Sequence, residues 1–337
     1  MKTVKLKKSK SVRSLCDKFQ HVGHLGRGGF SSVNLIKAEN SNVHFAAKCQ
    51  RSSSLQDRSI ARAEVEILRK CQQCPYIVQL VEFFEEVTSA CGVDSCRRPS
   101  CGVLHGSIIV TELLSGGDLW DMMVYKGGKI PEMKCMVIMV QVLEALKYIN
   151  AIEVVHLDVK LNNIMFTTRD PNNLHVKLID FGLAIALKHA DTIPCRGRGT
   201  PDFRSPEVSE HGHAVPASDL YSAGVVLYML LSGGMVPRWG AAQEREEMVS
   251  THLQASTRGA RLFISQLLET DYNQRPSAEE SLWGQWLTPS REMMRMGMMF
   301  RKDSVMVKRF KARKRWKKLI NCVRLSSYWY ISKGKIQ

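Results

Sequence analysis

The sequence predicts an α+β fold of two lobes, a small antiparallel β-lobe with one main helix and a larger, mainly helical lobe. Short β-like runs fill most of residues 21–110 and surround one stretch of helical spacing, 59–70. From residue 131 onward the apolar spacing becomes helical. The longest apolar run, 221–231, is too short to span a membrane, so it indicates a buried core helix.

Four β-like runs and one insertion define the small lobe. The runs are SSVNLI (31–36), VHFAAKC (43–49), YIVQLVEFFEE (76–86) and SIIVTEL (107–113). Between the last two lies an insertion with Cys91, Cys96 and Cys101, followed by His105. Their spacing differs from that of usual zinc sites, where paired ligands lie two to four residues apart, so a surface hairpin loop is favoured over a metal site.

The large lobe is predicted from helical periodicity. Pro131 stands at a helix start, and Met136, Val140, Leu143 and Lys147 follow near helical spacing. With 44% hydrophobic and 24% charged residues among 337, the composition is that of a soluble globular protein. The N-terminus has no apolar signal region and the 10 Cys are scattered, so we expect a reducing, cytoplasmic location, with the nucleus as an alternative.

The positive charge is concentrated at the C-terminal end. From Arg301 onward there are 13 Lys and Arg against Asp303 alone, which accounts for +12 of the net charge of +16. Residues 1–20 form a second, smaller basic arm. A charge asymmetry of this size predicts that the C-terminal segment meets an acidic protein, lipid or nucleic acid.

A glycine-rich stretch, GRGGFSSV, lies between two β-like runs, where backbone without side chains can fold over phosphates. Its expected phosphate-binding positions are Gly26, Gly28, Ser31 and Val33, with Ser31 standing where a third glycine is usual. Fifteen residues later Lys48 occurs in a strand, and Glu64 occurs in the helix that follows. A strand lysine held by a helix glutamate grips the α- and β-phosphates of a nucleotide.

Two motifs in the second lobe carry the chemistry. HLDVKLNN places Asp158, Lys160 and Asn163 in a loop, and VKLIDFGLA places Asp180 at the end of a strand. Phosphoryl transfer depends on positioning and charge neutralisation. These residues therefore predict a proton acceptor at Asp158, a γ-phosphate contact at Lys160 and an Mg²⁺ site at Asn163 and Asp180.

With GTPDFRSPE, SDLYSAG and NQRPS following in order, the chain resembles the eukaryotic protein kinase domain. The resemblance covers 21–287, with a small lobe at 21–113 and a large lobe at 114–287, and it leaves 288–337 as an autoregulatory tail. It implies a protein kinase that uses ATP and Mg²⁺ and acts on protein substrates.

The resemblance also assigns a nucleotide pocket that spacing alone does not define. It implies hinge backbone from Glu112 and Leu114, the pocket's back at Thr111, a ribose contact at Asp118, and purine contacts from Ala46 and Met165. It further implies that Asp219 braces the catalytic loop and that Glu207 pairs with Arg275. Thr200 resembles the residue that contacts the catalytic Asp and Lys in serine/threonine kinases, which favours those hydroxyls over tyrosine.

The details HLD, FAAK and GRGGF resemble the calmodulin-regulated kinases, nearest the death-associated protein kinases, and imply a role in apoptosis or cytoskeletal signalling. VKRFKARKRWKKLINCVRLSS resembles the calmodulin-binding segment of those kinases and of myosin light-chain kinase, so calmodulin is expected to bind residues 305–329. Trp316, Ile320, Val323 and Trp329 would give this basic segment an apolar stripe. Membrane binding and nuclear import remain alternatives, and direct nucleic-acid binding is not expected.

Two departures from the family pattern affect regulation and specificity. Leu157 stands where most kinases have Arg, so a phosphorylated activation loop would lack its main partner. Leu161 and Asn162 stand where relatives commonly have Pro and Glu, which removes a usual acceptor for basic substrates. A pseudokinase that only binds nucleotide is the alternative function, and a phosphate-transfer assay distinguishes the two.

Overall fold

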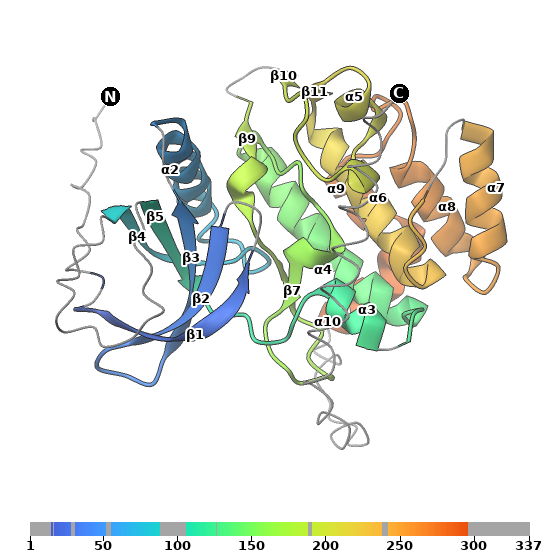
Figure 1. Ribbon diagram of the computed structural model, residues 1–337. Helices are drawn as coiled ribbons and strands as arrows, with labels where there is room; N and C mark the ends of the chain where they lie inside the picture. The colour runs from blue at the N-terminus through green and yellow to red at the C-terminus, as the bar shows by residue number, and fades with distance from the viewer. Residues whose placement is uncertain are drawn as a thin grey trace, which may run out of the picture. The chain divides into compact units, whose positions relative to one another are not determined.

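The computed structural model describes residues 15, 17–27, 31–51, 55–87, 106–125, 127–187, 191–237 and 242–295. All of them belong to Met1–Met299, the first of two compact units of the chain. Figure 1 shows in this unit a β-sheet lobe with one long helix and a lobe made mostly of helices. The predicted two-lobed α+β fold is therefore confirmed.

The small lobe is built on a five-stranded antiparallel sheet in the order β1-β2-β3-β5-β4. Its strands are β1 (Phe19–Arg27), β2 (Ser31–Ala38), β3 (His44–Arg51), β4 (Leu80–Val87) and β5 (Gly106–Glu112). The run predicted from Tyr76 becomes part of this sheet only at Leu80. Just before it, Val78 and Tyr76 exchange backbone hydrogen bonds with Leu178 of the large lobe, so this segment joins the two lobes.

Helix α2 (Leu55–Lys70) packs against β4 and β5 and begins one turn earlier than predicted. Ala61, Val65 and Leu68 are buried at the spacing of one helix face. Asp57 in the first turn and Lys70 in the last complement the helix dipole. The helix therefore presents Glu64, which lies on the same buried face, to the sheet.

A separate apolar cluster of the small lobe is formed by Ile36, Ala47, Cys49, Phe84, Ile108 and Val110. Leu15 and Phe19 pack against this cluster, and Phe19 makes edge-to-face contacts with Phe45 and Phe84 at centroid distances of 5.6 and 6.3 Å. The small lobe thus reaches back beyond the predicted start at residue 21, because Phe19 packs against its core.

The large lobe consists mainly of helices. Its helices are α3 (Leu119–Tyr125), α4 (Glu132–Ala151), α5 (Pro206–Ser209), α6 (Pro216–Ser232), α7 (Ala242–His252), α8 (Arg258–Leu267), α9 (Ala278–Trp283) and α10 (Thr288–Arg295). Short strands pair as β6 (Val154–Val155) with β9 (Ile185–Ala186), β7 (Ile164–Phe166) with β8 (Val176–Leu178), and β10 (Ile193–Pro194) with β11 (His213–Ala214). Short 3₁₀ turns are η1 (Leu161–Asn163), η2 (Phe181–Leu183), η3 (Pro201–Phe203) and η4 (Gln285–Leu287).

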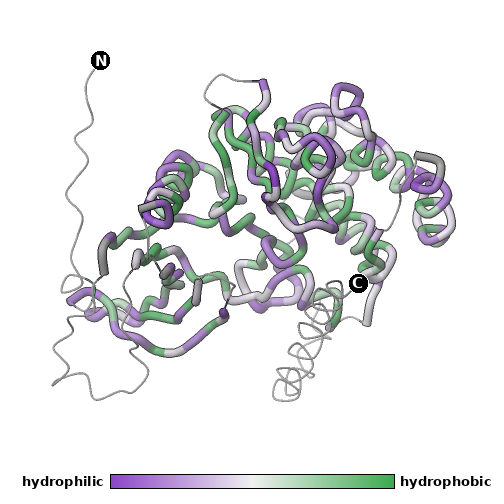
Figure 2. The backbone as a smooth tube through the Cα atoms, turned by 45° about the horizontal axis from the view of Figure 1, so that its top comes forward, coloured by the Kyte–Doolittle hydropathy of each residue, from purple (hydrophilic) through white to green (hydrophobic). Residues whose placement is uncertain are grey.

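Helix α6 contains the longest apolar run of the sequence and is buried along almost its whole length. It packs against α4 and α8, and its positive-φ C-cap, Gly233, ends it. Figure 2 shows that hydrophobic stretches gather where the helices of this lobe pack together. The buried core helix predicted at 221–231 is present. No helix of the described part of the chain is long and apolar enough to cross a membrane.

Helix α10 begins at residue 288, where the sequence placed the start of the tail. It packs against α4, the Ser290 side chain is buried, and the Arg291 guanidinium lies 4.1 Å from the ring centroid of Trp283. The catalytic unit therefore includes this helix. The cysteine-rich insertion and the tail from residue 296 onward, including the predicted calmodulin-binding segment, lie outside the described residues.

Candidate active site

Lys48 connects the two lobes through two carboxylates. Its Nζ lies 2.7 and 2.9 Å from the two carboxylate oxygens of Glu64 on α2, and 2.6 Å from Oδ1 of Asp180. Burial acts to lower the pKa of Lys48, but the charges of Glu64 and Asp180 outweigh it and raise the pKa. Lys48 is therefore a fixed positive charge at the junction of sheet, helix and large lobe.

Asp180 stands in a left-handed backbone conformation, with φ 62° and ψ 77°. Its side chain accepts a hydrogen bond from the backbone N–H of Gly182. Burial acts to raise the pKa of Asp180, and Lys48 more than reverses this, so the pKa is lowered and the group is an anion. The next residue, Phe181, is buried against the His156 ring at a centroid distance of 4.7 Å, which anchors this turn in the core.

Asp158 is held by three neighbouring side chains. The Thr200 hydroxyl donates to Asp158 Oδ1 at 2.6 Å, Lys160 Nζ lies 2.7 Å from Oδ2, and Asn163 Nδ2 donates to Oδ2 at 2.8 Å. Lys160 also donates to the Thr200 hydroxyl at 2.8 Å. The structure thus brings together Asp158, Lys160, Asn163 and Thr200, as the motifs predicted.

Asp219 on α6 fixes the backbone of the catalytic loop, the segment from His156 to Asn163, by two hydrogen bonds. Its carboxylate accepts the backbone N–H groups of His156 and Leu157 at 2.6 and 2.9 Å. Burial raises the pKa of Asp219 to about 7, although these two donors oppose the shift. The predicted bracing by Asp219 is confirmed.

The buried His156 ring adds a second support. Its Nε2 lies 3.1 Å from the Ile179 carbonyl, and its Nδ1 accepts the backbone N–H of Asp158. Burial lowers the pKa of this imidazole, which is consistent with one donating and one accepting nitrogen.

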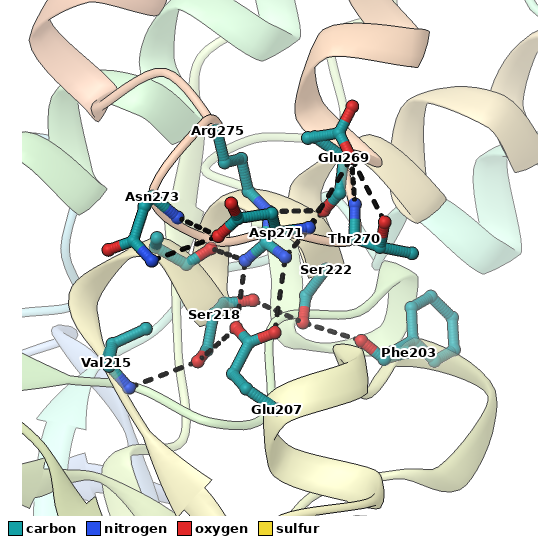
Figure 3. A network of polar contacts seen from close by, with 11 residues as sticks. Phe203, Glu207, Val215, Ser218, Ser222, Glu269, Thr270, Asp271, Asn273 and Arg275 are labelled. Atoms are coloured by element: carbon teal, nitrogen blue, oxygen red, sulfur yellow. Dashed lines mark hydrogen bonds and ion pairs between the residues drawn. The ribbon is translucent and has the colours of Figure 1, made fainter. Parts of the chain in front are cut away.

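A buried ion pair holds the segment that follows Thr200. Arg275 donates to both carboxylate oxygens of Glu207 at 2.9 and 3.2 Å, and both side chains are almost wholly buried. Figure 3 shows this pair within a network in which Ser218 donates to Glu207 and Arg275 also donates to the backbone carbonyl of Glu269. The predicted pairing of Glu207 with Arg275 is confirmed, and its role is structural.

Leu157 places an apolar side chain in this part of the site. It has a positive φ of 65° and packs in a buried cluster with Val155, Leu187, Cys195, Val208 and Ala214. Leu187 and Cys195 come from the segment between Asp180 and Thr200. This segment is therefore tied to the catalytic loop by apolar contacts.

The described residues of the predicted nucleotide site are spread over β1, β2, β3, β5 and the segment after β5, with Met165 on β7. Gly26 pairs with Val33 near the β1–β2 turn, and Ser31 begins β2. Gly28 lies outside the described residues. Ala46 pairs with Thr111 across β3 and β5, Leu114 is buried in the large core, and Asp118 forms a β-bridge with Met165.

Two of these residues have contacts that sequence reasoning did not identify. The Glu112 carboxylate receives Lys177 Nζ at 2.6 Å and the backbone N–H of Gln79 at 2.8 Å, so its side chain fastens the hinge to the large lobe. Asn162 donates to Asp118, whose pKa burial raises to about 6. The spacing of residues in the sequence does not predict the contacts of Glu112 or of Asp118, because each joins segments that are far apart in the chain.

The oxygen donors of the site suit a hard divalent cation. Asp180 contributes an anionic carboxylate, and the Asn163 amide nitrogen bonds to Asp158, which leaves its carbonyl oxygen as a ligand. Asp180 and Asn163 are the residues that would hold Mg²⁺, and Lys48 is the residue that would hold phosphates.

A family model described as the protein kinase domain matches residues 19–287. The chain belongs to the protein kinase family. The fold and the order of the catalytic segments described above agree with this assignment.

The chain of this kinase is similar to several named members of the family. Over 91% of its length it is 29% identical to the death-associated protein kinase dapk-1 of Caenorhabditis elegans, of which it covers 21%. Over 89% it is 28% identical to the smooth-muscle myosin light chain kinase of Gallus gallus, of which it covers 15%. The chain thus spans about a fifth or less of these relatives. The twitchin kinase region from C. elegans matches over 86% of the chain and 50% of that structure, with 27% identity and a TM-score of 0.68.

Proposed function

We propose that this kinase transfers the γ-phosphate of Mg-ATP to serine and threonine hydroxyls of proteins. The observation that carries the proposal is the arrangement around Asp158, whose carboxylate is held by Lys160, Asn163 and the Thr200 hydroxyl. This arrangement lies in one site with the Lys48–Glu64 pair and Asp180. The relatives, which are named as kinases, support the same activity.

Each residue has a defined task in the proposed reaction. Asp158 accepts the proton of the substrate hydroxyl, and Lys160 steadies the γ-phosphate. Lys48, held by Glu64, orients the α- and β-phosphates. Mg²⁺, when bound, neutralises the phosphate charge. These charged groups are already in position before the reaction, so they need not reorient as charge develops in the transition state, and this lowers the barrier.

The direct test is transfer of labelled phosphate to a generic protein substrate. It uses both the full chain with calcium and calmodulin and a chain ending at Met299. We expect incorporation on serine and threonine by at least one of them. Nucleotide binding without transfer by either would support the pseudokinase scaffold instead.

Activity is expected to be independent of phosphorylation of the activation segment. Leu157 contributes apolar contacts where an arginine would receive a phosphate, so removing phosphate should leave the segment in place. The measurement compares the rate of the chain ending at Met299 before and after phosphatase treatment, with mass spectrometry to verify the removal. A large loss of rate after dephosphorylation would contradict this expectation.

We further propose that the tail inhibits the kinase and that calcium-loaded calmodulin relieves the inhibition. A basic segment with an apolar stripe follows the catalytic unit, and a short connection gives it a high effective concentration at the substrate site, on the order of millimolar. The names of the relatives, death-associated and myosin light chain kinases, support this proposal and suggest signalling in cell death or in the cytoskeleton.

Trp316→Ala is expected to weaken calmodulin binding by about ten-fold or more, because a buried aromatic anchor contributes roughly 1.5–3 kcal/mol. The variant should also be poorly activated by calcium, whereas truncation near Asp303 should give calcium-independent activity. Calorimetry of residues 301–330 with calmodulin measures the binding. If no calcium-dependent binding occurs at micromolar concentration, membrane binding or nuclear import becomes the better explanation of the tail.

A further inference from the structure

Gln50 stands two residues after Lys48 on β3, so both side chains leave the same face of the strand. Its Nε2 donates to Glu64 Oε2 at 2.9 Å. The same carboxylate receives Lys48 Nζ on both oxygens. Glu64 is therefore tied to β3 by one charged and one neutral donor from neighbouring positions of the same strand.

In the part of the chain that the structure describes, the oxygen of the Gln50 amide has no such partner. Within the described residues, its Oε1 atom is buried and without a hydrogen-bond partner. Ser107, which pairs with Gln50 across β3 and β5, has a buried hydroxyl that also lacks a partner there. An unpaired buried polar atom costs stability, and an apolar side chain of similar size would avoid that cost. Among the described residues, the bond to Glu64 is the one hydrogen bond that the Gln50 side chain makes.

The charges around Glu64 indicate what the hydrogen bond from Gln50 contributes. Lys48 is shared between Glu64 and Asp180, so Lys48 alone does not determine where the Glu64 carboxylate points. The neutral donor of Gln50 gives that carboxylate a second contact with β3, independent of Lys48. It does so without adding a second positive charge that would compete with Lys48.

We propose that Gln50 is a positioning residue for nucleotide binding, which fixes the Glu64 carboxylate in the orientation that receives Lys48. The inference rests on the proposed function through the task of Lys48 in holding phosphates. It concerns binding and not the transfer step, because Gln50 touches neither Asp158 nor Asp180 among the described contacts.

The test compares Gln50→Met with Ser107→Ala in the full chain. Gln50→Met keeps the side-chain length and removes the donor, so we expect Kd for Mg-ADP and KM for Mg-ATP to rise about ten-fold, which is typical of a lost hydrogen bond to a charged group. The value of kcat should change little, and Tm should stay the same or rise. Ser107→Ala removes the other unpaired atom on the same face and should alter neither affinity nor kcat.

Gln50→Glu is the second variant, because it changes charge at constant shape. A second carboxylate beside Glu64 competes for Lys48, so the loss of affinity should exceed that of Gln50→Met. Equal nucleotide affinity in Gln50→Met and the unmodified chain overturns the inference, as does a loss of affinity that Ser107→Ala reproduces or that a lowered Tm accompanies.

Calorimetry with Mg-ADP separates this inference from the proposed function. If the unmodified chain transfers no phosphate but binds nucleotide, and Gln50→Met weakens that binding, the inference stands and the proposed activity fails. If transfer is normal and the affinity of Gln50→Met is unchanged, only the inference fails. If the unmodified chain binds no nucleotide, both fail.

Discussion

Replacing Asp158 by alanine is expected to lower kcat by about a thousand-fold while leaving Mg-ATP affinity nearly unchanged. The carboxylate is the proposed proton acceptor and is held by Lys160 and Thr200, but Asp158 is not itself among the residues proposed to hold the nucleotide or the metal. Initial rates over a range of ATP concentrations give kcat and KM. Asp158→Asn is the matched control for shape, and it should be as inactive as the alanine variant because the charge is lost.

Asp180→Ala should behave differently from the variants of Asp158. It removes an anionic ligand and a partner of Lys48, so both Mg-dependent nucleotide affinity and kcat should fall. Normal activity of purified Asp180→Ala would show that the assignment of the metal site is wrong.

Replacing Arg275 by leucine is expected to destabilise the large lobe by about 3–5 kcal/mol, because it leaves the buried Glu207 carboxylate without its charged partner. In a unit of this size that corresponds to a fall in Tm on the order of 10 °C. Thermal unfolding of the full chain, followed by circular dichroism, measures it. After the substitution the Glu207 carboxylate would keep neutral donors such as the Ser218 hydroxyl (Figure 3), which do not replace the lost positive charge.

The matched control is Lys147→Ala. Lys147 pairs with Glu279 at 2.8 Å, but the two side chains are 42% and 62% exposed, so solvent screens the pair. Its loss should cost less than about 1 kcal/mol. Similar Tm values for Arg275→Leu and Lys147→Ala would contradict the structural role of the buried pair.

Much of the fold could be predicted because its signals are local. The helical spacing at 131–147, the apolar run at 221–231 and the order of the catalytic motifs each lie within a short stretch of sequence. The pairs made by Asp219 and by Glu207 join distant segments, and they were predicted through family resemblance. Propensity alone would not have identified them.

The contacts that escaped prediction depend on which segments become neighbours. In the sequence Gln50 is one polar residue in a predicted strand. Its contact with Glu64 becomes visible only in the fold, where α2 places Glu64 beside it. Lys177 and Glu112 are 65 residues apart and meet only because the fold brings β8 close to the end of β5. The predicted end of the kinase domain at 287 agrees with the family match. The packing of α10 against α4 and Trp283 was not predicted, because α10 has no apolar run.

The apolar cluster around Leu157 limits how this kinase can be controlled. A phosphate can be added and removed by other enzymes, and salt weakens its ion pair with an arginine. Apolar contacts between packed methyl groups depend on neither phosphorylation nor ion pairing. The backbone of the segment between Asp180 and Thr200 also approaches the catalytic loop closely, since a Cβ added at Gly199 would lie 2.4 Å from the Leu157 carbonyl oxygen. Within the described residues, the contact between this segment and the catalytic loop at Leu157 is therefore expected to be insensitive to phosphorylation and to ionic strength.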